Sequence, residues 1–165
     1  MRELGVKRKP NGFSLIELLI VVAIILIIAA IAIPGYLNSR MVANEASAVS
    51  SVRTITTAET TYSSVYPTIG YSALLTDLGG GAGGAACVAT PANACLIDSV
   101  LAGGTKSGYR FIYVQDNSST PAIGYRINGD PIIRGSSGRR SFFTDQPGVI
   151  RYNLTAAATG TDPPL

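Results

Sequence analysis

An uninterrupted apolar segment near the N-terminus constrains the fold more than any other feature. Residues 13–33 are 21 consecutive residues of which only Ser14 and Glu17 are polar. A helix of this length rises about 31 Å, close to the roughly 30 Å hydrocarbon thickness of a bilayer. Leucine, isoleucine and valine surround such a helix and leave no polar face. The segment therefore predicts a membrane-spanning helix, because the other ~130 residues are too few to enclose it as a soluble core helix.

Basic residues before the apolar segment predict its orientation. Arg2, Lys7, Arg8 and Lys9 precede it, and the first basic residue after it is Arg40. The positive-inside rule then places the N-terminus in the cytoplasm and the rest of the chain on the exported side. Of the 13 basic and 10 acidic residues, four and one lie in residues 1–12, which leaves nine of each beyond them. This balance leaves no basic stripe for phosphates, so no nucleic-acid partner is expected.

The composition argues against an enzyme. The chain has no histidine, no tryptophan and only two cysteines. Histidine-based acid–base catalysis, the common nucleophile triads and the usual zinc ligand sets are thereby excluded. The glycine-rich run at residues 79–84 has no Lys-Ser/Thr partner, so it predicts a flexible surface loop and not a phosphate cradle. We expect no catalytic residue and no cofactor.

A short motif overlaps the start of the apolar segment. Lys9-Pro10-Asn11-Gly12-Phe13-Ser14-Leu15-Ile16-Glu17 leads into the apolar run, which ends at Pro34-Gly35-Tyr36. This pattern couples a basic leader, glycine before phenylalanine, and glutamate four residues later in one register. It resembles the type IV prepilins of the short-leader class over roughly residues 5–40.

The resemblance implies a processing and assembly pathway. A prepilin peptidase would cleave between Gly12 and Phe13, removing a leader of residues 1–12, and the new amine of Phe13 would be N-methylated. The chain would begin as a single-pass precursor in the bacterial inner membrane. It would then polymerise with copies of itself through residues 13–33 into an extracellular pilus.

The partners implied are that peptidase and N-methyltransferase, a platform protein and an assembly ATPase. The alternative is a pseudopilin of a type II secretion system, which forms a short periplasmic filament and shares the same motif.

Glu17 is the one charge inside the apolar segment. A carboxylate at the bilayer centre costs about 2.5–3.5 kcal/mol, and less near the interface. Cleavage before Phe13 would create an α-amine one helical turn away, able to pair with Glu17 of the same or a neighbouring chain and so to fix the axial register of packed subunits. The alternatives are a carboxylate that snorkels to the interface or one that is protonated.

Pro34 and Gly35 predict a weak point in a longer helix. Proline removes one backbone hydrogen bond and crowds the preceding turn, so a kink or loosening is expected near residues 30–34. The resemblance implies that the helix melts and stretches here on assembly. Apolar residues at helical spacing continue beyond, which predicts one helix from about Ser14 to Thr61. The alternative is a helix that ends at Ile33.

The remainder, residues 34–165, is expected to form an exported globular part that includes the second half of the helix. From Tyr66 onward, Pro67, Gly70 and Tyr71 are expected to break that helix. A short helical turn is predicted at residues 96–101, strands at 109–114 and 123–127, turns at 116–121 and 128–131, and a hairpin at 141–152 about residues 145–148. A sheet of three to four antiparallel strands packed on the helix gives an α+β pilin fold.

Two smaller features concern cross-links and metals. Cys87 and Cys95 are predicted to form a disulfide on the exported side, with two free thiols as the alternative. Asp116, Asp130 and Asp145 lie in or beside predicted turns. They could converge on Ca²⁺, as in secretion pseudopilins that the chain resembles, but turn formation is the role favoured here and no metal is expected.

Overall fold

The structure is a computed structural model that describes residues 12–80 and 87–165. The chain divides into two compact units between Leu37 and Asn38. The second unit, Asn38–Leu165, is called the head. The predicted leader falls outside the described residues apart from Gly12, and most of the glycine-rich run at 79–84 falls outside them as well.

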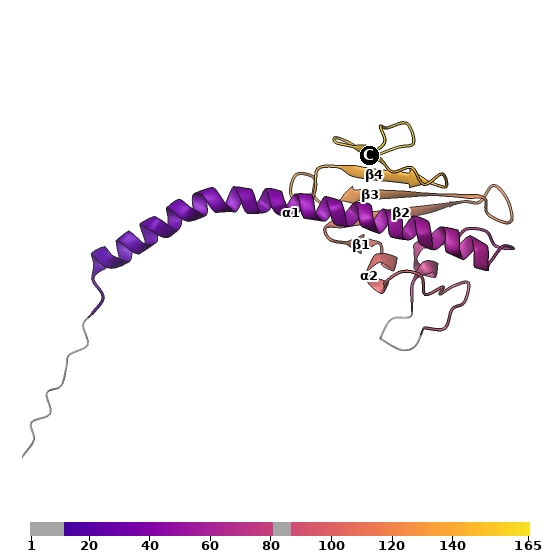
Figure 1. Cartoon of the computed structure of the whole chain (residues 1–165), viewed down its shortest axis with the longest axis horizontal. Coiled ribbons are helices and arrows are strands. Elements are labelled where there is room, and N and C mark those ends of the chain that lie inside the picture. The colour runs from indigo at the N-terminus through magenta and orange to yellow at the C-terminus, as the bar shows by residue number, and fades with distance from the viewer. Residues whose placement is uncertain (1–11, 81–86) are drawn as a thin grey trace, which may run out of the picture. The chain divides into compact units, whose positions relative to one another are not determined.

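One long helix, α1 (Leu15–Val65), runs through both units without a break (Figure 1). The predicted helix is confirmed, and the alternative that it ends at Ile33 is wrong, since Pro34 lies inside it. Five threonines of the second half bond back to the helix backbone. Each donates its hydroxyl to the carbonyl four residues earlier, as Thr54 does to Ser50 at 3.0 Å. Pro67 follows the last turn and disfavours helix in the residue before it.

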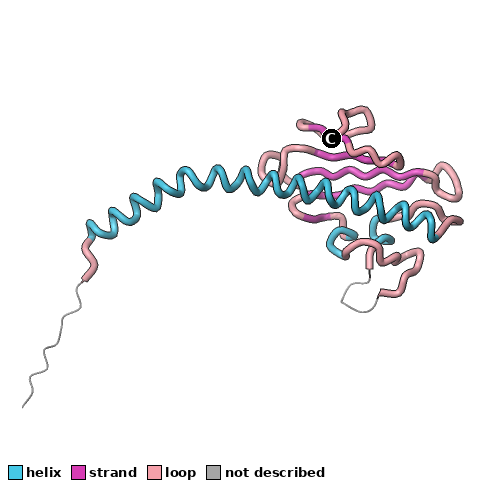
Figure 2. Tube along the Cα trace, in the orientation of Figure 1, coloured by secondary structure: helices cyan, strands magenta, loops and turns pink. Residues whose placement is uncertain are grey.

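The head contains one five-stranded antiparallel sheet in the order β1-β2-β3-β4-β5 (Figures 1 and 2). Its strands are β1 (Thr105–Lys106), β2 (Tyr109–Asp116), β3 (Gly124–Pro131), β4 (Ser141–Asp145) and β5 (Arg151–Asn153). Two short helices, η1 (Leu75–Leu78) and α2 (Ser99–Ala102), lie in the connection from α1 to the sheet. The predicted α+β pilin arrangement is confirmed.

Residues 162–165 run along the free side of β5. The Tyr152 N–H donates to the Pro163 carbonyl at 3.1 Å, and the Leu165 N–H donates to the Ile150 carbonyl at 2.9 Å. An isolated antiparallel bridge joins Arg151 to Pro164. This segment therefore covers the outer edge of the sheet.

The core lies between the second half of α1 and one face of the sheet. Alternation along β2 places Tyr109 and Phe111 on this face and Arg110 on the other. The core cluster combines residues of α1, of the α1–β1 connection and of three strands; its fully or almost fully buried members include Val52, Ile55, Tyr62, Leu78, Leu101, Tyr109, Ile127 and Phe142. The two layers thus share one hydrophobic core.

The structure corrects the turn predicted at residues 128–131. These residues form the second half of β3, where Gly129 pairs with Phe111 and Pro131 with Tyr109. A side chain at Gly129 would meet the Phe111 ring at 3.3 Å, so this glycine allows close packing inside a strand and does not mark a turn. Pro131 is tolerated because it lies beyond the residues of β3 that pair with β4, where the strand has a partner on one side only.

The hairpin prediction is confirmed. β4 pairs with β5, and the Gly148 N–H donates to the Asp145 carbonyl at 2.8 Å. Gly148 has φ +76°, a conformation that favours glycine. The predicted helical turn is found as α2, which starts three residues later than expected. β1 is a fifth strand that the sequence did not predict, because two residues carry no alternation.

Candidate functional site

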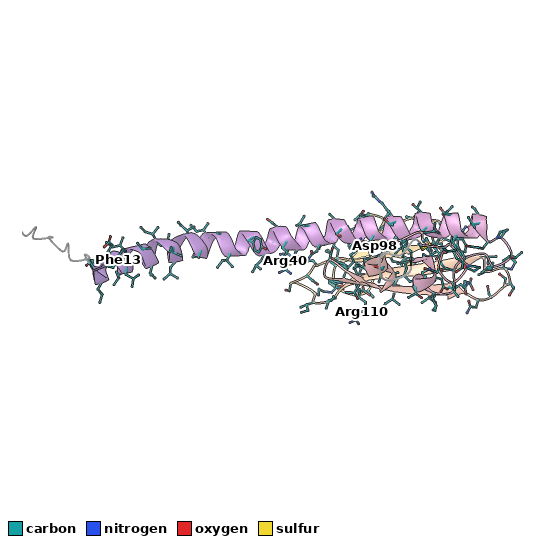
Figure 3. The ribbon with its side chains drawn as sticks, turned by 90° about the horizontal axis from the view of Figure 1, so that it is seen from below. Phe13, Arg40, Asp98 and Arg110 are labelled. Atoms are coloured by element: carbon teal, nitrogen blue, oxygen red, sulfur yellow. A yellow bond between two sulfur atoms is a disulfide. The ribbon has the colours of Figure 1, made fainter. Side chains whose placement is uncertain are left out.

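The described chain begins with an open segment before α1. Among the described residues, no atom lies within 4 Å of the position that a side chain at Gly12 would occupy, and Phe13 is 70% exposed. Figure 3 shows Phe13 at this end of the helix. The Ser14 carbonyl accepts the N–H groups of Glu17 and Leu18 at 3.1 and 3.2 Å, which starts the helical ladder. Glu17 therefore stands in the first turn, one turn from Phe13.

The surface that follows is almost wholly apolar. Between Leu15 and Leu37 no described side chain is buried, and even Ile24, near the middle, is 52% exposed. By length and composition α1 could cross a membrane. An apolar surface this extended is far larger than soluble monomers expose. It requires lipid or other helices to cover it.

A family comparison identifies this segment. Residues 7–33 match the model described as the prokaryotic N-terminal methylation motif. The chain carries the prepilin signature. Type IV pilins and type II secretion pseudopilins share this signature, which covers only the N-terminal segment of this chain. Its apolar helix fits a membrane-anchored precursor.

Comparison of the whole chain with curated proteins and with solved structures gives no significant match. The identification therefore depends on residues 7–33 and on the α+β arrangement of the head.

Pro34 and Gly35 lie inside α1 and are exposed. A side chain added at Gly35 would meet no atom of the described residues within 4 Å. Close packing against these residues therefore does not require glycine at this position. A kink at these residues remains a prediction.

Glu45 bonds α1 to a part of the head that is distant in the sequence. One carboxylate oxygen accepts the backbone N–H groups of Arg139 and Arg140 at 2.7 and 3.2 Å, and the other accepts the Arg140 Nε–H at 2.7 Å. Burial raises the pKa of Glu45, but the bonds from Arg139 and Arg140 outweigh it and hold the pKa below its ordinary value. Sequence reasoning missed this contact, which spans more than 90 residues.

The Arg134 side chain cross-links several groups of the same region. Its guanidinium donates to the carbonyls of Arg139, Leu154 and Ala156 and to the Ser141 hydroxyl, the last at 2.6 Å. Asn44 adds a bond from α1 to the Ser137 carbonyl at 2.9 Å. Residues 132–140 are thus fixed against α1 and against the segment that follows β5.

Glu59 is a buried carboxyl group on the core face of α1, with 0% of the residue exposed. It accepts bonds from the Ser72 hydroxyl at 2.5 Å and the Ser72 N–H at 3.1 Å. Burial raises the pKa of Glu59, and these bonds offset the effect only in part. The Tyr113 hydroxyl donates to the Ser72 carbonyl at 2.8 Å and completes a small polar network. Its role is structural, because it joins α1, the following loop and β2.

Cys87 and Cys95 form a disulfide, with Cα atoms 6.1 Å apart. The cross-link lies beside a short connection in which the Cys95 N–H donates to the Gly79 carbonyl at 2.9 Å. Gly79 also forms a parallel bridge with Ile97. The disulfide therefore ties Cys87 to Cys95, whose backbone is held against Gly79.

The three aspartates do not come together. Asp116 ends β2 opposite Gly124, whereas Asp130 pairs with Arg110 near the other end of the sheet. Asp145 lies opposite Arg126 in the β3–β4 ladder and lines the same groove as Asp116. Among the described residues no group of three or more histidine, cysteine, aspartate or glutamate side chains could hold a metal ion.

Proposed function

We propose that the chain is cleaved between Gly12 and Phe13, N-methylated at Phe13, and polymerised through residues 13–33 into a type IV pilus. One observation carries the proposal. The prepilin signature leads directly into a helical surface whose large apolar side chains have no cover within the described chain. The signature is that of a structural class and not of a catalytic family.

Two environments can cover this surface in turn. In the precursor, lipid surrounds it, and after extraction neighbouring helices replace the lipid. Lipid tails are as apolar as leucine, so helix association depends on close packing rather than on the hydrophobic effect. Ala29, Ala30 and Ala32 lie on this segment and allow close approach of neighbouring helices. Extraction needs energy from outside the chain, which the assembly ATPase and the platform protein would supply.

Glu17 and the new Phe13 amine are proposed to set the register of the subunits. Glu17 lies in the first turn of α1, where the helix dipole favours a negative charge. An amine of a neighbouring chain paired with this carboxylate would fix one helix along the axis of the next. Such a pair adds little net stability but rejects shifted packings, because a shift leaves a charge unpaired in an apolar bundle.

Pro34 and Gly35 are proposed as the place where α1 loosens on assembly. The proline removes one bond of the helical ladder, and glycine lowers helix stability by about 1 kcal/mol relative to alanine. Residues just before them are therefore the least costly part of α1 to extend.

Mass spectrometry of filaments sheared from intact cells tests the proposal. The expected species begins with N-methylated Phe13 and is abundant in the sheared fraction. A Gly12→Val variant is the control, since a branched side chain beside the cleaved bond should leave the precursor intact. A processed chain found only in the membrane fraction would instead favour the type II secretion pseudopilin.

A further inference from the structure

The charges of the head are separated along the sheet. One end, where β2 and β4 begin and β3 finishes, is called the basic end and carries Arg40, Arg134 and Arg139. Asn38 and Arg139 line a common groove, and Asn44 is bonded to Ser137, which places this part of α1 beside residues 132–140.

Several basic groups at this end have acidic partners within the head. Two ion pairs form among the described residues, Lys106 with Asp98 and Arg140 with Glu45, both of them at or next to this end. Arg110 faces Asp130 across the β2–β3 ladder and projects from the sheet away from α1 (Figure 3). Arg40, Arg134 and Arg139 form no ion pair within the part of the chain that the structure describes.

The opposite end, called the acidic end, carries Asp116 and Asp145. Both line a groove of about 440 Å³ at the ends of β2 and β4. Arg126 also lines it, so the groove holds two carboxylates and one guanidinium. The Asp116 carboxylate accepts the Ser118 N–H at 3.0 Å, and this bond holds the pKa of Asp116 below its ordinary value. The groove is therefore negative at neutral pH.

The distance between the two ends prevents their charges from neutralising one another. The pairs Tyr109–Pro131 and Gly124–Asp116 mark the two ends of the β2–β3 ladder. Seven residue steps separate them, about 24 Å at 3.4 Å per residue. This exceeds the Debye length of about 8 Å at physiological ionic strength. Each end is thus available to a charge on another molecule.

We propose that the basic end of one head docks on the acidic end of a second copy, with Arg139 of one copy entering the groove between Asp116 and Asp145 of the next. The inference rests on the proposed filament and names the contact between its heads. A contact between two different ends of identical chains is head-to-tail, and such contacts repeat without closing when the rotation does not form a ring.

Both of the proposed docking surfaces are already formed within a single head. Glu45 holds the Arg139 backbone N–H at 2.7 Å, so the loop that presents the guanidinium is already ordered. The Arg139 side chain itself is exposed and has no hydrogen bond among the described residues. On the other copy, a guanidinium fits two carboxylates better than an ammonium does, because its donors form a planar fork. Complementary charges of this kind select the partner and the register more than they raise affinity.

Charge exchange tests the contact in the full chain, expressed in cells that assemble filaments. Arg139→Glu and Asp145→Arg should each lower the yield of sheared filaments at least fivefold. The double variant should restore the yield to within twofold of the original. Arg53→Glu is the matched control, since this exposed arginine lies on α1 away from the groove, and it should leave the yield unchanged.

Two further variants distinguish a defect in assembly from a defect in folding. Arg139→Lys keeps the charge and should retain most of the yield, whereas Asp145→Asn removes a charge without adding one and should lower the yield less than Asp145→Arg. Unchanged melting of the head in each variant shows that the yield reports assembly. Full yield from both reversed single variants, or no recovery in a folded double variant, overturns the proposal.

Photo-crosslinking locates the contact independently of filament yield. With Gln146→p-benzoylphenylalanine, irradiation of cells should join two copies, and the second copy should be linked within residues 132–140. A link to any other segment overturns the proposed contact even if filaments form. Absence of filaments from the unmodified chain, by contrast, counts against the proposed pilus and not against the contact, which the cross-link still decides.

Discussion

The two halves of α1 belong to one continuous helix, but the more apolar half is exposed and the more polar half is partly buried. The first half, up to Leu37, is the most apolar part of the chain, yet none of its described side chains is buried. The second half is rich in serine and threonine but has nine buried residues: Met41, Glu45, Ala48, Ser51, Val52, Ile55, Ala58, Glu59 and Tyr62. An apolar helix surface therefore has to be covered by something. Only the fold shows whether other parts of the same chain cover it.

Glu17→Ala should produce the largest effect, and only on assembly. Loss of the carboxylate removes the proposed register pair, so filament yield should fall at least tenfold. Head stability should not change, because Glu17 lies outside the head. Sheared-filament yield and thermal unfolding of the purified chain in detergent measure the two effects, with Ser14→Ala as the control. Normal filaments from Glu17→Ala would show that the register hypothesis is wrong.

A matched pair of isoleucine substitutions compares the two halves directly. Ile55 is 0% exposed and lies in the core, whereas Ile24 is 52% exposed. Ile55→Ala should lower the free energy of unfolding of the head by about 2–5 kcal/mol through lost burial and a residual cavity. Ile24→Ala should change it by less than about 0.5 kcal/mol. Denaturant unfolding followed by tyrosine near-UV dichroism checks both, and equal effects would break the comparison.

Removal of the Glu45 carboxylate should loosen α1 from residues 132–140. Glu45→Ala leaves the N–H groups of Arg139 and Arg140 without their acceptor, at a cost of about 2–3 kcal/mol. Glu45→Gln keeps one acceptor oxygen and should lose less. Because the folded pKa of Glu45 is lowered, its contribution is present above its ordinary pKa of 4.5 and is lost as the pH falls through the folded value. Stability curves between pH 2 and pH 7 test this sign.

Opening the disulfide should destabilise the head by a similar or smaller amount. The two cysteines are separated by 8 positions, and for a loop this short the chain-entropy model gives about 2.5 kcal/mol. Cys87→Ser with Cys95→Ser should therefore lower the melting temperature without changing membrane insertion of the first half of α1. Fractionation and thermal melts measure the two properties. Alkylation of both thiols in the untreated, unreduced chain would contradict the pairing.

Glu59 should give the smallest effect, with the opposite dependence on pH from Glu45. Its folded pKa is raised, so its contribution is fully present below the ordinary value of 4.5 and is lost as the pH rises through the folded value. Glu59→Gln keeps the shape and removes the ionisation. It should raise the melting temperature at pH 7 by about 2–4 °C and have little effect near pH 4. A rise of the same size at both values would show that burial of the charge is not the cause.

The sequence was most informative where the determining interactions are local. The apolar run and the motif at Gly12-Phe13 need no distant contact to be recognised, and alternation after Tyr109 together with Pro147-Gly148 predicts strands and a hairpin from adjacent residues. The turn predicted at Asn128-Gly129-Asp130-Pro131 was wrong. The packing of the Phe111 ring over Gly129 overrides the turn propensity of these residues. The contact of Glu45 with Arg139 joins residues 94 positions apart, and no local pattern indicates it.

The segment that lines β5 affects how copies of the head can combine. An open strand edge offers unpaired N–H and carbonyl groups to any similar strand, and crowded domains with such edges fuse by strand addition. Here residues 162–165 occupy that side of the sheet, and the prolines at 163 and 164 bring no N–H groups of their own. At this edge, heads brought together in the proposed filament can therefore meet through side chains but not by adding a strand to the sheet. Contacts at this edge can therefore be undone subunit by subunit.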